Sequence, residues 1–112
     1  AAQWVSARCV ADHLWQVGDS VFVVGRVLGA KGKPVDGVRL EYLVKASNGL
    51  WSMLPDFYVT GTDGVFQTCS SQYFMGDTLR IKATTHEGEA FITALPLGDH
   101  VNAVIVRVPP AP

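Results

Sequence analysis

The sequence predicts one all-β domain, an antiparallel sandwich of about seven or eight short strands. Apolar and polar residues alternate with a period of two along most of the chain, and no stretch keeps an apolar period near 3.6 for three turns. Turn-forming pairs with Gly, Asn or Asp recur between the alternating segments. The 112 residues suffice for a single domain with its own core.

The first half of the chain begins with an expected strand from Trp4 to Ala11. Ser20 to Leu28 is the most β-branched segment and should form the next strand. A turn built on Gly32 and Pro34 leads into the strand Val38 to Ala46. In that strand, alternation predicts inward Val38, Leu40, Tyr42 and Val44, and outward Arg39, Glu41 and Lys45.

Asn48-Gly49 is the strongest hairpin signal, because both residue types tolerate the positive φ of a type I′ turn. It should fold Leu50 to Met53 back on the preceding strand. Leu54-Pro55-Asp56 is expected to interrupt this strand, and Phe57 to Thr60 should resume it.

Four further strands should follow turns that contain Gly next to Asp or Glu. These turns are Asp63-Gly64, Gly76-Asp77, Glu87-Gly88 and Gly98-Asp99. The strands are Val65 to Ser71, Thr78 to Thr85 (Leu79, Ile81 and Ala83 inward, Arg80 and Lys82 outward), Glu89 to Leu95 and Val101 to Val108. The domain should therefore cover residues 1–108, with 109–112 as a proline-rich tail or linker.

Cys9 and Cys69 are the only cysteines, and they are not in a CxxC pair. We expect them to form one disulfide, which would stabilise the fold by roughly 4 kcal/mol in the chain-entropy model; two buried free thiols are the alternative. A disulfide implies a secreted, cell-surface or periplasmic protein. The start Ala1-Ala2-Gln3 resembles a mature end after signal-peptide cleavage, or a trimmed chain.

Composition argues against several partners. The chain is 48% hydrophobic and 17% charged, with a net charge of −1, which is ordinary for a folded domain. The basic residues are scattered, and only Lys31 and Lys33 share a turn, so nucleic acid is not expected. No apolar run approaches the roughly 18 residues that cross a bilayer.

Three segments carry a family resemblance: GRVLGAKGKPVDGVRLEY (Gly25 to Tyr42), GTDGVF (Gly61 to Phe66) and GDTLRIKATT (Gly76 to Thr85). Together they resemble the bacterial immunoglobulin-like modules of invasin and intimin type adhesins. The shared residues are mainly those of turns, over about half of the chain. The resemblance implies an immunoglobulin-like sandwich with a role in adhesion or spacing.

The same turns are similar to those of the transthyretin-like group, which includes carboxypeptidase regulatory domains, hydroxyisourate hydrolases and intradiol dioxygenases. The hydrolases carry a His before the Gly-Pro turn, where this chain has Gly25 and Arg26, and they end in Tyr-Arg-Gly-Ser, which is missing here. The dioxygenases bind iron with two Tyr and two closely spaced His, whereas His86 and His100 are far apart. Neither activity is implied.

Antibody domains are a third comparison, because Cys9 and Cys69 have a separation suited to a bridge between sheets. However, Gln67 stands where their corner tyrosine would be.

No motif of a catalytic or metal site is present. There is no G-x-S-x-G elbow for a nucleophilic serine, and His13, His86 and His100 lack zinc-binding spacing. We therefore expect no catalytic residue, no metal and no cofactor, and a protein that is not an enzyme.

The aromatic residues of the middle of the chain are the candidate partner contacts: Trp51, Phe57, Tyr58, Tyr73 and Phe74. If they were exposed together, they would suit a protein surface or a sugar ring. The alternative is that most of them fill the core.

The sequence thus favours a non-catalytic, exported β-sandwich module for adhesion, protein–protein interaction or spacing in a bacterial surface or secreted protein. Its partner would be a protein: a host or surface receptor, or neighbouring modules of the same chain. The alternatives are a carbohydrate-binding module, a subunit of an assembled particle or tail, and, disfavoured by its missing motifs, a small transthyretin-like hydrolase.

Overall fold

The computed structural model describes residues 21–45, 48–69, 73 and 76–109, and for Asp56 and Cys69 the backbone alone. Within these residues the chain forms seven strands, which confirms the predicted all-β sandwich. They are β1 (Phe22–Leu28), β2 (Arg39–Lys45), β3 (Trp51–Val59), β4 (Val65–Cys69), β5 (Thr78–Thr84), β6 (Ala90–Pro96) and β7 (Val101–Arg107).

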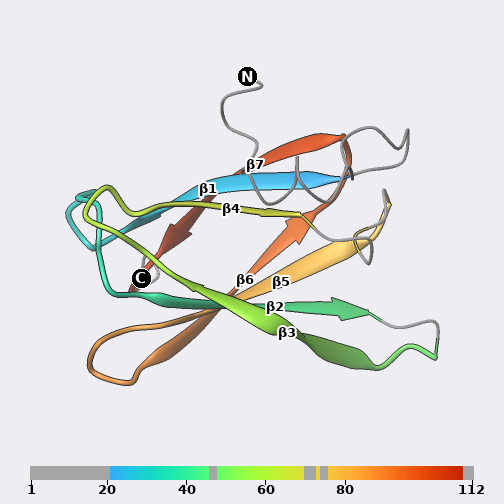
Figure 1. The fold of residues 1–112 in the computed structure, drawn as a ribbon, viewed down its shortest axis with the longest axis horizontal. Helices are drawn as coiled ribbons and strands as arrows, with labels where there is room; N and C mark the ends of the chain where they lie inside the picture. Colours follow the sequence, from blue (N-terminus) through green and yellow to red (C-terminus); the bar gives the residue numbers. More distant parts are fainter. Residues whose placement is uncertain (1–20, 46–47, 70–72, 74–75, 110–112) are drawn as a thin grey trace.

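The strands form two layered sheets (Figure 1). The three-stranded sheet has the order β4-β1-β7, and the four-stranded sheet has the order β3-β2-β5-β6. β1 and β7 are parallel, with Phe22 opposite Val101, whereas every other pair of these strands is antiparallel. The parallel pair was not expected, because alternation along a strand says which residues face the core but not which strand lies beside it.

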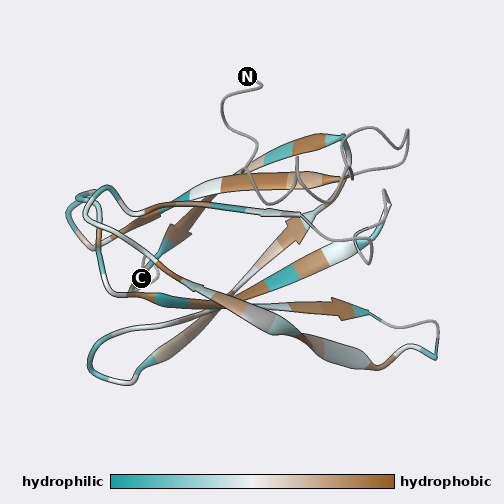
Figure 2. Cartoon of the chain, viewed as in Figure 1, coloured by the Kyte–Doolittle hydropathy of each residue, from teal (hydrophilic) through white to brown (hydrophobic). Residues whose placement is uncertain are grey.

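The core lies between the two sheets. Side chains from both sheets fill it, including Val23, Val27 and Phe66 from one sheet and Leu40 and Ile81 from the other. Figure 2 shows hydrophobic and hydrophilic positions alternating along β5. The inward positions predicted for β2 and β5 are confirmed, since Val38, Leu40, Tyr42, Leu79, Ile81 and Ala83 are all buried and Val44 packs against the core.

β3 is one nine-residue strand, so the interruption expected at Leu54-Pro55-Asp56 was wrong. The pairing with β2 shifts register here: Phe57 lies opposite Glu41, and Met53 lies opposite Leu43. Three residues of β3 therefore face only Tyr42, as in an enlarged β-bulge. Because β3 is at the sheet edge, Pro55 can join it without removing a ladder hydrogen bond inside the sheet.

The turn at Asn48-Gly49 connects β2 and β3, as predicted. Gly49 has a φ of +84°, a conformation that side chains with a Cβ rarely adopt. The Asn48 side-chain oxygen accepts a hydrogen bond of 3.0 Å from the Leu50 N–H. This contact fixes the start of β3, so Trp51 falls opposite Lys45.

The expected strand Trp4 to Ala11, the turn Gly18-Asp19 and Cys9 lie outside the described residues. Within the part of the chain that the structure describes, no helix is long and apolar enough to span a membrane.

Candidate functional site

One side of the four-stranded sheet faces away from the core and carries an unusual set of side chains. Leu40 and Tyr42 of β2 point into the core, so the alternate positions of β2 and their partners in neighbouring strands point outward. We call this side the outer face. Its members include Trp51, Met53, Phe57 and Val59 of β3, Arg39, Glu41, Leu43 and Lys45 of β2, Arg80 and Lys82 of β5, and Ile92 of β6.

Two arginines of the outer face stack on aromatic rings. The guanidinium carbon of Arg80 lies 4.0 Å from the ring centroid of Trp51, and that of Arg39 lies 3.8 Å from the ring centroid of Phe57. Arg39 also lies beside Glu41, with 3.7 Å between Nη2 and Oε2. Stacking restrains each guanidinium while its N–H donors, which lie in its plane, stay available for a carboxylate.

The outer face is locally cationic. Its described side chains include four cations, Arg39, Lys45, Arg80 and Lys82, and one carboxylate, Glu41, although the whole chain has a net charge of −1. In the sequence these residues are scattered, because two other strands separate β2 from β5 along the chain. Their outward direction was predicted, but the adjacency of β2 and β5 was not.

Exposed apolar side chains lie among these cations. Met53, Phe57, Val59 and Ile92 are 43%, 51%, 50% and 55% exposed. Single exposed apolar residues are common on protein surfaces. Four on one sheet face, beside two arginines stacked on aromatic rings, form an exposed patch in which apolar and cationic side chains are mixed.

The five candidate aromatic contacts do not form one patch. Trp51 and Phe57 lie on the outer face. Tyr58 is 43% exposed but points to the opposite side of β3, since it pairs with the inward Leu40. Tyr73 is buried, and its hydroxyl shares a hydrogen bond of 2.8 Å with the Thr68 hydroxyl, so it belongs to the core. Phe74 lies outside the described residues.

Near Tyr73 the core holds a second buried phenol, that of Tyr42. Its hydroxyl has no hydrogen-bond partner among the described residues. Burial, together with the neighbouring Tyr73 and Tyr58, raises the pKa of Tyr42 above the ordinary tyrosine value. Tyr42 packs in the core as a buried, neutral phenol.

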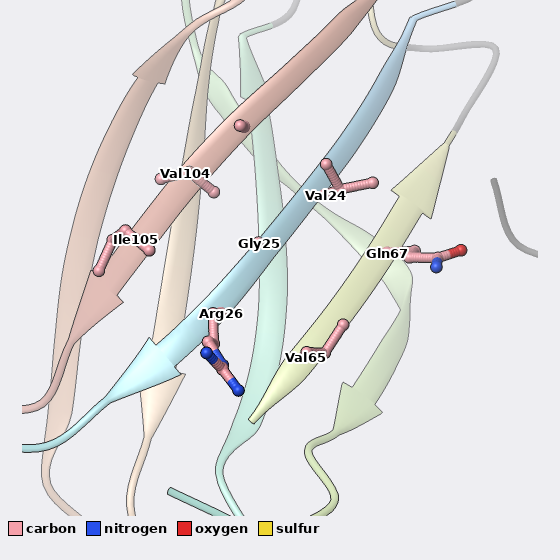
Figure 3. A pocket seen from close by; sticks show the side chains of 8 residues that line it. Val24, Gly25, Arg26, Val65, Gln67, Val104 and Ile105 are labelled. Carbon is pink, nitrogen blue, oxygen red and sulfur yellow. The ribbon is translucent and has the colours of Figure 1, made fainter. Parts of the chain in front are cut away.

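A pocket of about 670 Å³ lies on the three-stranded sheet. Figure 3 shows Val24 on β1, Val65 and Gln67 on β4, and Ile105 on β7 around it. The lining is mostly apolar, and the side-chain oxygen of Gln67 is buried without a hydrogen-bond partner in the described part of the chain.

His86 and His100 lie in different connections, His86 after β5 and His100 before β7. The strand β6 separates the two connections, so the structure does not bring these side chains together. Among the described residues, no three His, Cys, Asp or Glu side chains are grouped so that they could hold a metal ion.

Comparison with known proteins gives relatives by structure alone. No protein-family model matches the sequence, and no curated protein matches it. The dioxygenase domain of a dioxygenase carbohydrate-binding protein fusion from Streptomyces sp. SirexAA-E has a TM-score of 0.60 at 19% identity, over 81% of this chain and 80% of that chain.

Two further structures are similar. 3-Chlorocatechol 1,2-dioxygenase from Rhodococcus opacus 1CP gives a TM-score of 0.59 at 14% identity, over 81% of this chain and 59% of that chain. Transthyretin from Sparus aurata gives 0.48 at 19% identity, over 75% of this chain and 86% of that chain. At such low identity the dioxygenase matches show a shared fold.

Proposed function

We propose that this chain is a non-catalytic binding module of an exported bacterial protein, and that it contacts a protein partner through the outer face. The observation that carries the proposal is the pair of arginine–aromatic stacks set among exposed apolar side chains. Adhesion, or spacing between neighbouring modules, is the role that such a contact would serve.

The residue types of the outer face support a protein partner. Tryptophan, phenylalanine, methionine and arginine are enriched at the centres of protein interfaces, where a few of them supply most of the binding energy. The face offers each type on a rigid sheet, at Trp51, Phe57, Met53, Arg39 and Arg80.

A carbohydrate-binding module is the second candidate, because Trp51 and Phe57 could serve as platforms for sugar rings. Each of these rings, however, already has a guanidinium over one face, at 4.0 and 3.8 Å. A sugar that stacked on that face would have to displace an arginine and forfeit the stacking energy. The arrangement therefore favours a protein over a sugar.

The non-catalytic part of the proposal is supported by the residues at the positions of the enzymes that the chain resembles. Gly25 and Arg26 stand where the hydrolases have a histidine, and His86 and His100 belong to different connections. The likeness to dioxygenase domains is a likeness of fold, which does not carry activity.

Export is the part of the proposal that depends on the expected Cys9–Cys69 disulfide. Cys69 ends β4 and pairs with Phe22 at the start of β1, so it lies close in space to the point where the N-terminal segment enters the sandwich. A bond from this position to Cys9 would anchor that segment, and it requires an oxidising compartment.

Two matched variants test the contact surface. Met53→Ser/Ile92→Ser removes two exposed apolar side chains from the outer face, and Val101→Ser/Ile105→Ser removes two of similar exposure from β7. Each variant and the wild type are used to capture partners from the surface fraction of the producing cells, with quantitative mass spectrometry. We expect one protein that the wild type and the β7 variant retain and the outer-face variant loses.

The proposal fails if the two variants lose the partner equally, or if neither loses it. Light scattering of the purified chain addresses assembly into a particle or tail. A discrete oligomer that only Met53→Ser/Ile92→Ser dissociates would make the outer face a contact between copies and replace the module role.

A further inference from the structure

We infer that the partner segment bound by the outer face is an acidic polypeptide. This inference rests on the proposed function and specifies the chemistry of its partner. It depends on three features of the outer face: uncompensated cations, a restrained guanidinium, and apolar side chains between them.

Three of the four cations of the outer face have no ion-pair partner among the described residues. Lys45, Arg80 and Lys82 form no ion pair there, and Arg39 reaches the Glu41 carboxylate only at 3.7 Å. Glu41 is the one described carboxylate of the face, and it lies opposite Lys82 in the β2–β5 ladder without forming an ion pair with it. A partner that brings carboxylates would complete these pairs, and exclusion of water would strengthen them.

Arg80 is already held in a binding orientation. Its guanidinium lies over Trp51, two strands away, so it spans β2 and its position on the sheet is restrained. A restrained arginine loses less conformational entropy when it binds a carboxylate through two parallel N–H···O bonds. The stack thus prepares a site for an Asp or Glu side chain above β2.

The apolar side chains favour a polypeptide over other polyanions. Met53 and Ile92 are 43% and 55% exposed and flank the cations on β3 and β6. Nucleic acids and acidic polysaccharides have no aliphatic side chains to bury against them, whereas a peptide can alternate acidic and apolar residues. Single-stranded nucleic acid also needs free ring faces for its bases, and here one face of each ring carries a guanidinium.

The sheet edges make the face itself the preferred place for the partner. β3 and β6 are the edge strands of the four-stranded sheet, and each contains a proline, Pro55 and Pro96. A proline lacks an N–H and breaks the row of donors that an added strand would need. The partner is therefore expected to lie across the side chains of the sheet.

The test uses a short synthetic peptide of glutamate and leucine, with its glutamine–leucine counterpart as the control. Binding to the 15N-labelled full chain is followed by amide chemical shifts and by calorimetry, at low and high NaCl. We expect the acidic peptide to shift amides of β2, β3 and β5, to bind more weakly at high salt, and to bind at least about tenfold more tightly than the glutamine peptide.

Charge variants complete the test. Arg80→Gln/Lys82→Gln should weaken binding of the acidic peptide by about tenfold or more, whereas Lys31→Gln/Lys33→Gln, with the same loss of charge in the β1–β2 connection, should change it by less than about twofold. Equal weakening by the two pairs would overturn the inference. The inference would also be overturned if polygalacturonate or an oligothymidylate bound at the same amides more tightly than the acidic peptide.

The failure of this inference differs from failure of the proposed function. If the natural partner is lost by Met53→Ser/Ile92→Ser but kept by Arg80→Gln/Lys82→Gln, the outer face is an interface and the acidic character of its partner is refuted. If the natural partner is kept by both variants, the proposed function itself fails.

Discussion

The side chain of Arg80 reaches across a whole strand to lie 4.0 Å above the ring of Trp51. Arg80 belongs to β5 and Trp51 to β3, and β2 runs between them. Such a contact ties three strands of the sheet together from the outside, so it can contribute to stability as well as to binding.

A double-mutant cycle measures this contribution. The wild type, Arg80→Met, Trp51→Leu and the double variant are unfolded with urea. The coupling free energy is taken from their four free energies of unfolding. We expect a coupling of about 0.5–1 kcal/mol, the usual value for an exposed cation–π pair. Additive effects of the two substitutions would mean that the stack contributes nothing to stability.

Thr60 links the end of β3 to the segment that enters β2. Its buried hydroxyl accepts a hydrogen bond of 3.1 Å from the Val38 N–H and donates one of 2.9 Å to the Val35 carbonyl. Thr60→Val keeps the shape but leaves these two backbone groups unpaired, and we expect it to lower the free energy of unfolding by about 2–4 kcal/mol. Thr60→Ser retains the hydroxyl, so in urea unfolding it should be clearly more stable than Thr60→Val.

Gly25 sits where β1 passes close to the core ring of Phe66. A Cβ at this position would lie 2.5 Å from Phe66 Cζ and 2.7 Å from the backbone oxygen of Val104. Because the backbone oxygen cannot move independently of β7, Gly25→Ala should cost about 1–3 kcal/mol in thermal or urea unfolding.

Gly98→Ala is the matched control for Gly25→Ala. A Cβ at Gly98 would meet no atom within 4 Å, so this change should alter stability by less than about 0.5 kcal/mol. A similar loss in both variants would show that the cost does not come from the contact with Phe66 and Val104.

Much of the fold could be predicted from local patterns. The alternation in β2 and β5 predicted that Leu40, Tyr42, Leu79 and Ile81 lie in the core, because each strand of a sandwich has one side that faces the core and one that faces solvent. The position of Gly49 was predicted equally well, since its positive φ is a local requirement. The interruption predicted at Pro55 was wrong, because an edge strand tolerates a proline that an inner strand would not.

The outer face could not be predicted, for a different reason. The sequence shows that Arg39 and Arg80 point outward, but it does not show that β2 and β5 are neighbours or that β3 lies within reach of both. Strand order depends on long-range packing, so cations 41 positions apart became one cluster only in the folded chain. The parallel pairing of β1 and β7 escaped prediction for the same reason.

The expected bond between Cys9 and Cys69 can be tested by intact mass under denaturing conditions. A monomer that takes up alkyl groups on both cysteines only after reduction would establish the disulfide and support export. Alkylation of both thiols without reduction would remove this support, and the localisation would then have to be sought inside the cell. Replacing Cys69 by Ser should lower stability by up to roughly 4 kcal/mol if the bond exists.

Tyr42 predicts how stability changes at alkaline pH. Its buried hydroxyl has no partner in the described chain, so Tyr42→Phe should be neutral or slightly stabilising near pH 8. The pKa of Tyr42 is raised in the folded protein by burial first, and then by Tyr73 and Tyr58. In the unfolded chain a tyrosine loses its proton near pH 10.

Above about pH 10 the unfolded chain therefore binds fewer protons than the folded one, and stability falls as pH rises. One pH unit above the unfolded pKa, this proton accounts for about 1.4 kcal/mol, which Tyr42→Phe does not lose. In urea unfolding, the advantage of the variant over the wild type should therefore grow between pH 8 and about pH 11. An unchanged difference would mean that the phenol reaches water or a base in the folded protein.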